Sequence, residues 1–277
     1  MKDMGKASLD ELKIIANLIR QDIVKMLNTA GSGHAGGSLG MADIFTVLYF
    51  NILKHTPLQT KNIYRDRLVL SNGHICPVQY ATLARAGYFP LVKLKSLRKI
   101  NSALQGHPHQ NSLPGIETSS GPLGQGISQA VGMALAAKIN KQSHHIFCIT
   151  SDGEHNEGQV WEAVMSAYKY KLNNLINIID YNGIQIDGFT KDIMPLGSLR
   201  KKYESFGWYV LEMNGHNIKE IIKTLQQAKQ IKNPVAVIAH TTLGKGVSFM
   251  TNKFVWHGLA PNEKETRMAL KELENAK

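Results

Sequence analysis

The sequence has few cysteines, no long apolar run and no signal-like N-terminus. Only Cys76 and Cys148 occur, without a CxxC pair, so nothing supports a thiolate zinc site. No apolar stretch reaches the roughly 18 residues that a membrane span needs. The N-terminal residues mix charged with apolar side chains, unlike a signal peptide. These absences predict a cytoplasmic protein with no membrane partner, no disulfide and a buried Cys148.

The sequence also lacks any block of basic residues, although its formal net charge is +11. A nucleic-acid-binding surface is one explanation for such a charge. The lysines are dispersed along the chain, however, which favours a solvated basic surface. We therefore expect no nucleic-acid partner. A basic surface still gives a modest attraction for phosphorylated small molecules.

The composition is that of a globular protein, with 43% hydrophobic residues in 277. It is sufficient for a single domain over residues 1–277, with an N-terminal helical segment at about 1–30. Apolar residues at helical spacing predict a helix over 8–28. The glycine-rich stretch 31–40 predicts a loop, and an apolar helical pattern returns at 41–53.

Short apolar runs then alternate with helical patterns. Strands are expected at 67–71, 145–150, 175–180, 208–213 and 234–240, and helices at 74–86, 127–139, 159–170 and 217–230. Uniformly apolar strands between helices are typical of a parallel sheet covered on both faces. The fold class predicted is therefore α/β, a three-layer α/β/α domain with a mainly parallel sheet. Ligands bind such sheets beyond the carboxyl ends of the strands.

Asp152 and Asn182 each follow one of these strands. Mg²⁺ prefers oxygen ligands and often shares them with a phosphate. The Asp152 carboxylate, the Asn182 amide oxygen and the backbone carbonyl of Ile184 would provide the protein's share. Gly153 would let the backbone approach that phosphate closely. The alternative is that Asp152 and Asn182 are capping residues at strand–helix turns.

Glycine-rich loops and histidines form the second polar feature. His34, His74, His107 and His257 each adjoin a glycine in an expected loop. Neutral histidines donate hydrogen bonds to phosphate or sugar oxygens and transfer protons near neutral pH. Each histidine alone has the alternative of a structural or surface role. The GPLGQG segment lacks the Lys-Ser/Thr ending of a P-loop, so it has the alternative of a simple turn.

Seven segments occur in the order found in the N-terminal part of transketolase. They are SGHAGGSLGMAD, VLSNGH, QGHPH, GIETSSGPLGQGISQAVGMA, SDGEHNEGQVWEA, DYNGIQIDG and TTLGKGVSF…WHG. The chain resembles this family from residue 32 to residue 258. The resemblance implies the thiamine-diphosphate-binding fold and the transfer of a two-carbon ketol unit between sugar phosphates.

The resemblance implies a role for each matching residue in holding thiamine diphosphate and its metal. Asp152, Asn182 and the Ile184 carbonyl would bind Mg²⁺ or Ca²⁺. The cofactor itself would contact His74, Gly121, Leu123, Gly153, Asn182 and His257, with Gly121 and Leu123 beside its rings.

The resemblance also implies catalytic roles. His34, His107 and His257 would face the sugar, and Glu157 would couple at a subunit interface to a catalytic glutamate of a partner. Two positions depart from the family pattern. Ser151 replaces the first glycine of GDG, and His109 replaces a glutamate often found after GHP. The second departure leaves sugar specificity open.

No segment resembles the pyrimidine-binding domain of transketolase, which carries the glutamate that activates the cofactor. The resemblance therefore implies the N-terminal subunit of a split enzyme of the pentose phosphate pathway. Its partner would be a C-terminal subunit, with two copies of each chain in a hetero-oligomer. One alternative is a subunit of a specialised ketol transferase or of a deoxyxylulose-phosphate-synthase-like enzyme. The other is a non-catalytic metal- or diphosphate-binding module.

Overall fold

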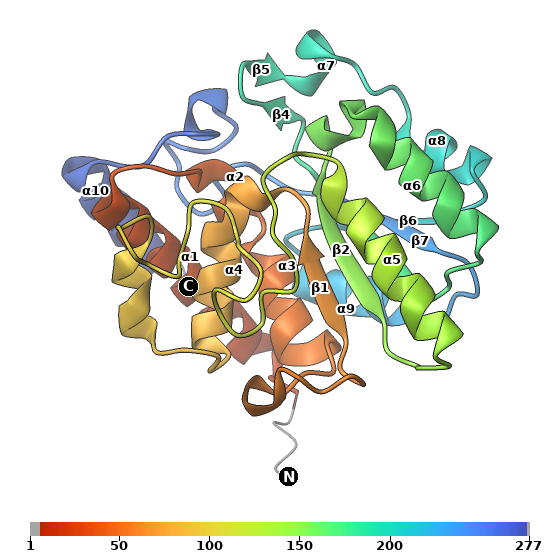
Figure 1. The fold of residues 1–277 in the computed structure, drawn as a ribbon. Helices are drawn as coiled ribbons and strands as arrows, with labels where there is room; N and C mark the ends of the chain where they lie inside the picture. Colours follow the sequence, from red (N-terminus) through yellow and green to blue (C-terminus); the bar gives the residue numbers. More distant parts are fainter. Residues whose placement is uncertain (1–5, 276–277) are drawn as a thin grey trace.

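A five-stranded parallel sheet organises the chain (Figure 1). The computed structural model describes residues 6–275. In spatial order the strands are β1 (Arg67–Leu70), β2 (Ile146–Ser151), β3 (Leu175–Tyr181), β7 (Val235–His240) and β6 (Tyr209–Asn214). All neighbours are parallel, with Ser151 beside Asp180 and Asp180 beside Ala239 at one edge. The five predicted strands are confirmed.

Helices cover both faces of the sheet, which confirms the three-layer α/β/α prediction. Successive residues of a strand point to opposite faces. In β2, Phe147 and Ile149 pack in one core while Ile146 and Cys148 pack in the other. The first core lies under α1 (Leu9–Ala30), α3 (Ala42–Val47), α4 (Cys76–Arg85), α9 (Ile218–Ala228) and α10 (Glu263–Asn275). The second lies under α5 (Gln125–Ile139), α6 (Gly158–Lys169) and α8 (Leu199–Ser205).

The predicted helix at 8–28 is confirmed as α1, with clear signals at both ends. Ser8 and Glu11 form a capping box, in which each side chain bonds the other's backbone N–H. The helix ends at Gly31, whose φ of 69° is the left-handed conformation that glycine adopts without steric cost. Residues 1–5 of the predicted N-terminal segment lie outside the described residues.

The prediction of a loop at 31–40 is wrong in its second half, where α2 (Ala35–Gly40) is a buried helix. The glycines serve close packing rather than chain flexibility. A Cβ on Gly36 would lie 2.5 Å from Cγ of Leu243, and one on Gly40 would lie 2.9 Å from the carbonyl oxygen of Thr242. Each glycine in a helix costs roughly 1 kcal/mol relative to alanine. Burial of the whole segment offsets this cost. Larger residues at these positions would push the segment away from the 241–243 loop and reduce that burial.

We expect Gly40→Ala to destabilise the protein by about 1–3 kcal/mol, the usual cost of overpacking. The matched control is Gly132→Ala in α5, where an added Cβ meets nothing within 4 Å. That exposed substitution should stabilise the helix by roughly 0.5–1 kcal/mol. Urea denaturation of both variants measures the difference. A Gly40→Ala variant as stable as the wild type would show that the helix can move away from Thr242.

Several smaller elements were not predicted. Beyond β3 the chain forms a short hairpin of β4 (Ile184–Gln185) and β5 (Gly188–Phe189), followed by α7 (Thr190–Ile193) (Figure 1). The predicted helix at 41–53 is α3 continued by a π-helical turn, Leu48–Ile52. Short 3₁₀ segments occupy Pro57–Gln59, Gly73–Ile75, Leu91–Ser96, Gly153–Asn156 and Phe254–Trp256. Among residues 6–275, no helix has both the length and the apolar character of a bilayer-crossing segment.

Candidate functional site

The turn after β3 meets the turn after β2 at Asp152. This side chain is only 1% exposed. Its carboxylate accepts hydrogen bonds from the backbone N–H of Gly153 at 2.8 Å and of Gly183 at 2.7 Å. Gly183 lies between Asn182 and Ile184, and the Asn182 side-chain oxygen accepts from the Ile184 N–H at 2.9 Å. The structure therefore brings Asp152 against the turn that carries the other two predicted metal ligands, Asn182 and Ile184.

A second buried carboxylate, Asp180, lies beside this turn and was missed by the sequence reasoning. Its oxygens accept hydrogen bonds from the Asn182 amide at 3.0 Å and from the Thr241 hydroxyl. Burial and, to a smaller extent, the nearby charge of Asp152 together raise the pKa of Asp180 to about 7. Burial likewise raises the pKa of Asp152 to about 6. Two carboxyl groups buried this closely favour a bound cation, which stabilises their ionised forms.

The donor set fits a hard divalent cation. It combines one carboxylate with an amide oxygen and a backbone carbonyl, the oxygen ligands that Mg²⁺ and Ca²⁺ take. Within the described residues, no group of three or more His, Cys, Asp or Glu side chains is arranged to hold a metal. A cation at Asp152 would thus keep coordination positions for oxygens from outside the protein, as Mg²⁺ does when it binds a diphosphate.

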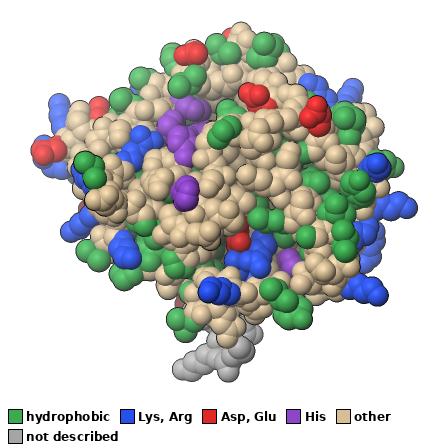
Figure 2. Space-filling view, viewed as in Figure 1, with side chains coloured by type: hydrophobic (Ala, Val, Ile, Leu, Met, Phe, Trp, Pro, Cys, Tyr) green, Lys and Arg blue, Asp and Glu red, His purple; other side chains and the backbone are tan. Residues whose placement is uncertain are grey.

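The four histidines singled out in the sequence form one cluster. Figure 2 shows histidine side chains gathered on one face of the molecule. The ring centroids of His34 lie 5.1 Å from His74, 5.8 Å from His257 and 6.4 Å from His107, and His74 lies 5.2 Å from His257. His34 precedes α2, His74 precedes α4, and the other two lie in loops. Segments far apart in the sequence therefore contribute to a single imidazole-lined surface.

Burial keeps these histidines uncharged at neutral pH. It lowers the pKa of His34 to about 4, helped by repulsion that a protonated His34 would meet from protonated His257, from Arg98 and from protonated His107. Burial also lowers the pKa values of His74, His107 and His257. A neutral imidazole has one nitrogen that donates and one that accepts. The cluster can therefore bind hydroxyl groups and pass protons between them.

Polar atoms without partners mark the same region. The Nδ1 atom of His34, both amide atoms of Asn72 and the hydroxyl of Ser120 are buried and have no hydrogen-bond partner in the structure. Buried polar groups are normally paired, because leaving one unpaired costs free energy. A Cβ on Gly73, between Asn72 and His74, would lie 2.2 Å from the Ser120 hydroxyl. These atoms suit a polar ligand or bridging waters, and Asn72 and Ser120 lie in the glycine-rich motifs.

The turn that carries Gly121 and Leu123 is fixed by a buried glutamate that the sequence reasoning missed. Glu154 is fully buried, and its carboxylate accepts from the backbone N–H of Gly124 at 2.5 Å, the Ser71 hydroxyl and the Ser151 N–H. Leu123 is tied through its carbonyl, which accepts from Gln159 at 2.9 Å. Glu154 thereby holds this turn against the ends of β1 and β2.

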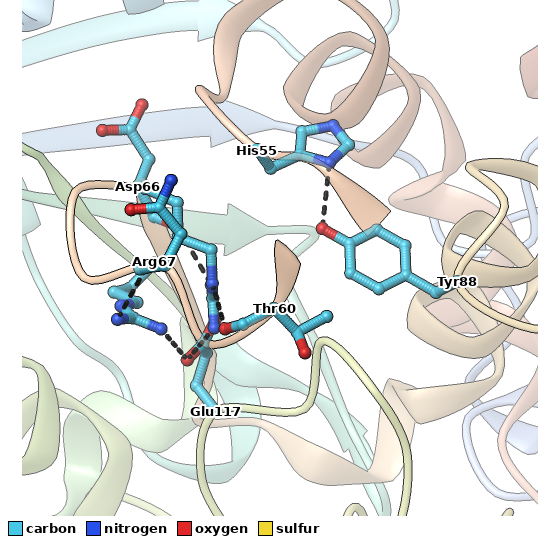
Figure 3. A network of polar contacts seen from close by, with 8 residues as sticks. His55, Thr60, Asp66, Arg67, Tyr88 and Glu117 are labelled. Atoms are coloured by element: carbon cyan, nitrogen blue, oxygen red, sulfur yellow. Dashed lines mark hydrogen bonds and ion pairs between the residues drawn. The ribbon is translucent and has the colours of Figure 1, made fainter. Parts of the chain in front are cut away.

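The loop that carries His107 and Gly121 is anchored at Glu117. The Glu117 carboxylate accepts hydrogen bonds from Arg65 at 3.0 Å and Arg67 at 3.3 Å, in a buried network at the start of β1 (Figure 3). In the same network the Tyr88 hydroxyl bonds His55 at 2.9 Å (Figure 3). An ion pair buried this deeply fixes where the loop passes over the sheet, since breaking it would leave an unpaired charge.

Among the predicted site residues, only Glu157 is exposed. Its carboxylate makes no ion pair with any other residue in 6–275. It precedes α6 and makes no side-chain cap there. A Cβ on Gly124 would lie 2.9 Å from its Cβ, so Glu157 adjoins the 121–124 turn. The structure therefore places it at the rim of the site rather than in the histidine cluster.

Comparison with known proteins identifies the family. Residues 12–275 match the family described as transketolase, thiamine diphosphate binding domain. The chain belongs to the transketolase family. The resemblance noted in the sequence is thus confirmed, and with it the assignment to a domain family that binds thiamine diphosphate and to enzymes that transfer ketol groups.

Two relatives match this transketolase domain over nearly their full length. It is 41% identical to the 6-deoxy-6-sulfo-D-fructose transketolase subunit SqwG of Clostridium sp. (strain MSTE9), over 98% of each chain. It is also 41% identical to an apulose-4-phosphate transketolase subunit of Actinobacillus succinogenes, over 97% of this chain and 98% of the relative. A crystal structure of Campylobacter jejuni transketolase superposes with a TM-score of 0.92 at 36% identity, covering 97% of this chain and 43% of that chain.

Proposed function

We propose that this chain is the N-terminal subunit of a split transketolase, active only with a C-terminal partner subunit that carries the pyrimidine-binding domain. The observation that carries the proposal is the combination of two groups of residues beyond the carboxyl ends of the strands. One is the set of oxygen donors at Asp152 and Asn182, and the other is the cluster of four neutral histidines. Relatives of matching length that are themselves named transketolase subunits support the split arrangement.

The cofactor would be held by the residues named above. Asp152, Asn182 and the Ile184 carbonyl would bind Mg²⁺, or Ca²⁺ in its place. Gly153, Asn182, His74 and His257 would contact the diphosphate side, and Gly121 and Leu123 would line the rings. When bound, thiamine diphosphate supplies a carbon nucleophile and an electron sink.

This chain's own part in the reaction is binding and proton transfer. His34, His107 and His257 would orient the sugar hydroxyls through neutral imidazoles and move a proton at the hydroxyl that becomes a carbonyl. Burial of the cluster keeps much of the water away, which strengthens each of these hydrogen bonds. Glu157, exposed at the rim, would meet the partner subunit.

The proposal includes the physiological setting. Residues 1–277 would act as one domain in a cytoplasmic hetero-oligomer with two copies of each chain, serving the pentose phosphate pathway. The names of the two relatives favour a second candidate, a specialised ketol transferase. One relative is named for a sulfonated sugar and the other for a sugar phosphate. Both candidates use a sugar that ends in an acidic group.

Reconstitution tests the proposal. The chain and a C-terminal partner subunit, purified together with thiamine diphosphate and Mg²⁺, should convert xylulose 5-phosphate and ribose 5-phosphate, while the chain alone should be inactive. Parallel assays with 6-deoxy-6-sulfofructose and apulose 4-phosphate as donors separate the two candidates. If the pair bound the cofactor but used no ketose donor, both would be wrong and a non-catalytic binding module would remain.

A further inference from the structure

A chain of polar side chains crosses the second core, which is otherwise largely apolar and lies under α5, α6 and α8. The Thr150 hydroxyl donates to the amide oxygen of Asn177 at 3.1 Å, and the Asn177 amide nitrogen donates to the Tyr203 hydroxyl at 2.9 Å. That hydroxyl lies 2.8 Å from Nε2 of His155, and Nδ1 of His155 lies 2.7 Å from the Ser151 carbonyl oxygen. The first four side chains are at most 1% exposed, so solvent does not reach these bonds.

The direction of each hydrogen bond follows from the end of this chain at Ser151. A carbonyl oxygen only accepts, so Nδ1 of His155 carries the proton and Nε2 of the neutral ring accepts. The Tyr203 hydroxyl therefore donates to Nε2, and its oxygen accepts from Asn177. Burial lowers the pKa of His155 to about 4, which keeps the ring in this neutral form. A buried network in which every member is paired holds its side chains in one arrangement.

The Ser151 carbonyl needs this donor because it lies past the end of β1. The last pair between β1 and β2 joins Leu70 to Ile149, and the Ile149 carbonyl accepts from the N–H of Ser71. Carbonyls of a strand point to the same neighbour at every second residue, so that of Ser151 is the next on this side. No residue of β1 reaches it there, and His155 supplies the missing donor.

His155 thereby fixes the peptide group that leads into Asp152. The carbonyl of that peptide accepts from His155, and its N–H, which belongs to Asp152, donates to the Asp180 carbonyl at 3.1 Å. The backbone N–H of His155 also donates to the Asp152 carbonyl at 2.9 Å. The backbone of Asp152 is thus held on both sides, and its carboxylate points to the N–H groups of Gly153 and Gly183.

We propose that His155 is a positioning residue for the predicted metal site. Through the carbonyl that precedes Asp152 it sets the direction of the Asp152 carboxylate, and Tyr203 and Asn177 hold the imidazole ring for that task. The proposal rests on the proposed function, because it takes Asp152 as a metal ligand. Mg²⁺ demands near-ideal octahedral geometry, so a small rotation of one ligand weakens its binding. Removing a group that orients a metal ligand commonly lowers metal affinity about 10- to 100-fold.

Two substitutions of His155 separate the roles of its two nitrogen atoms. The amide nitrogen of asparagine lies as many bonds from the backbone as Nδ1, so His155→Asn keeps a donor for the Ser151 carbonyl. The amide of glutamine reaches as far as Nε2, so His155→Gln keeps only the bond to Tyr203. Each variant breaks one bond of the buried chain, and both should unfold at similarly reduced urea concentrations. Thr150→Val, which removes the hydroxyl at the far end of the chain, is the matched control.

Mg²⁺ binding and amide exchange give two readouts that a loss of stability alone would not change. Calorimetry of the full-length chain with its partner subunit and thiamine diphosphate measures the Mg²⁺ affinity. His155→Gln should weaken Mg²⁺ binding about tenfold or more, and His155→Asn and Thr150→Val by less than about threefold. In the isolated full-length chain, NMR hydrogen exchange follows the N–H groups of Gly153 and Gly183 that are bonded to Asp152. These should exchange about tenfold faster in His155→Gln than in the other two variants.

The outcomes separate this proposal from the proposed function. If His155→Gln and His155→Asn lost Mg²⁺ affinity equally, or if Gly183 exchanged alike in both, His155 would only fill the core and the proposal would be wrong. If the wild-type pair bound thiamine diphosphate without Mg²⁺, the metal assignment in the proposed function would fail. The exchange of Gly183 would then still show whether His155 orients the Asp152 carboxylate.

Discussion

Asp152→Ala should abolish the metal-dependent retention of thiamine diphosphate. The side chain is the only carboxylate in the predicted ligand set, and it is buried. Removing one partner of a buried charge pair costs about 2–5 kcal/mol, which corresponds to roughly a 30- to 4,000-fold loss of affinity. Calorimetry of the reconstituted pair, with cofactor added at several Mg²⁺ concentrations, measures the loss. Ketol transfer should fall in parallel.

Two further variants make the experiment specific. Asp152→Asn keeps an acceptor for one of the N–H groups of Gly153 and Gly183, so it separates loss of charge from loss of hydrogen bonds. Asp187→Asn, on the exposed tip of the neighbouring hairpin, is the matched control. Circular dichroism should show an intact fold for all three. If Asp152→Ala kept normal activity at limiting Mg²⁺, the metal would have to bind elsewhere.

The sheet could be predicted because buried parallel strands leave a strong local signal. The runs at 145–150 and 175–180 are uniformly apolar, since both faces of β2 and β3 are covered by helices. Polar residues directly after such runs must lie at the carboxyl edge of the sheet. The proximity of Asp152 and Asn182 therefore followed from the sequence, before any side-chain position was known.

Features that depend on packing between distant segments could not be predicted in this way. The glycine content of 31–40 predicts a loop, but half of this segment is the helix α2. Its glycines are there because they allow close contact with residues 241–243. Glu154 follows β2 and Asp180 lies near the end of β3, where either could be an ordinary exposed charged residue, yet both are buried and bonded to other segments. Arg98 lies in irregular backbone with a positive φ, where no periodicity indicates which way a side chain points.

The histidine cluster falls between these cases. Its members were singled out because each adjoins glycine in a loop, but their separations in sequence match no compact motif. Only the resemblance to transketolase suggested that they share a site. In the structure they come together because their segments precede α2 and α4 or cross the same edge of the sheet. Their common burial, rather than any sequence neighbour, lowers their pKa values and keeps them neutral.

Glu157→Gln should have a large effect that appears only in the assembled enzyme. The Glu157 side chain is exposed and makes no ion pair within the described residues, so neutralising it should leave the stability of the isolated chain unchanged. If it couples to a catalytic glutamate of the partner subunit, kcat of the pair should fall about 10²–10⁴-fold, the range for acid–base groups. Steady-state assays and thermal unfolding of both forms measure the two effects.

The control for this prediction is Glu162→Gln, an exposed carboxylate on α6. It changes the charge of the chain equally but lies farther along the helix from the 121–124 turn. Sedimentation of each variant with the partner separates weakened assembly from slowed chemistry. If Glu157→Gln and Glu162→Gln gave the same kcat as the wild type, Glu157 would be a surface residue. If only Glu157→Gln slowed a pair that still assembles, Glu157 would act through the subunit interface. The active site would then be divided between two chains.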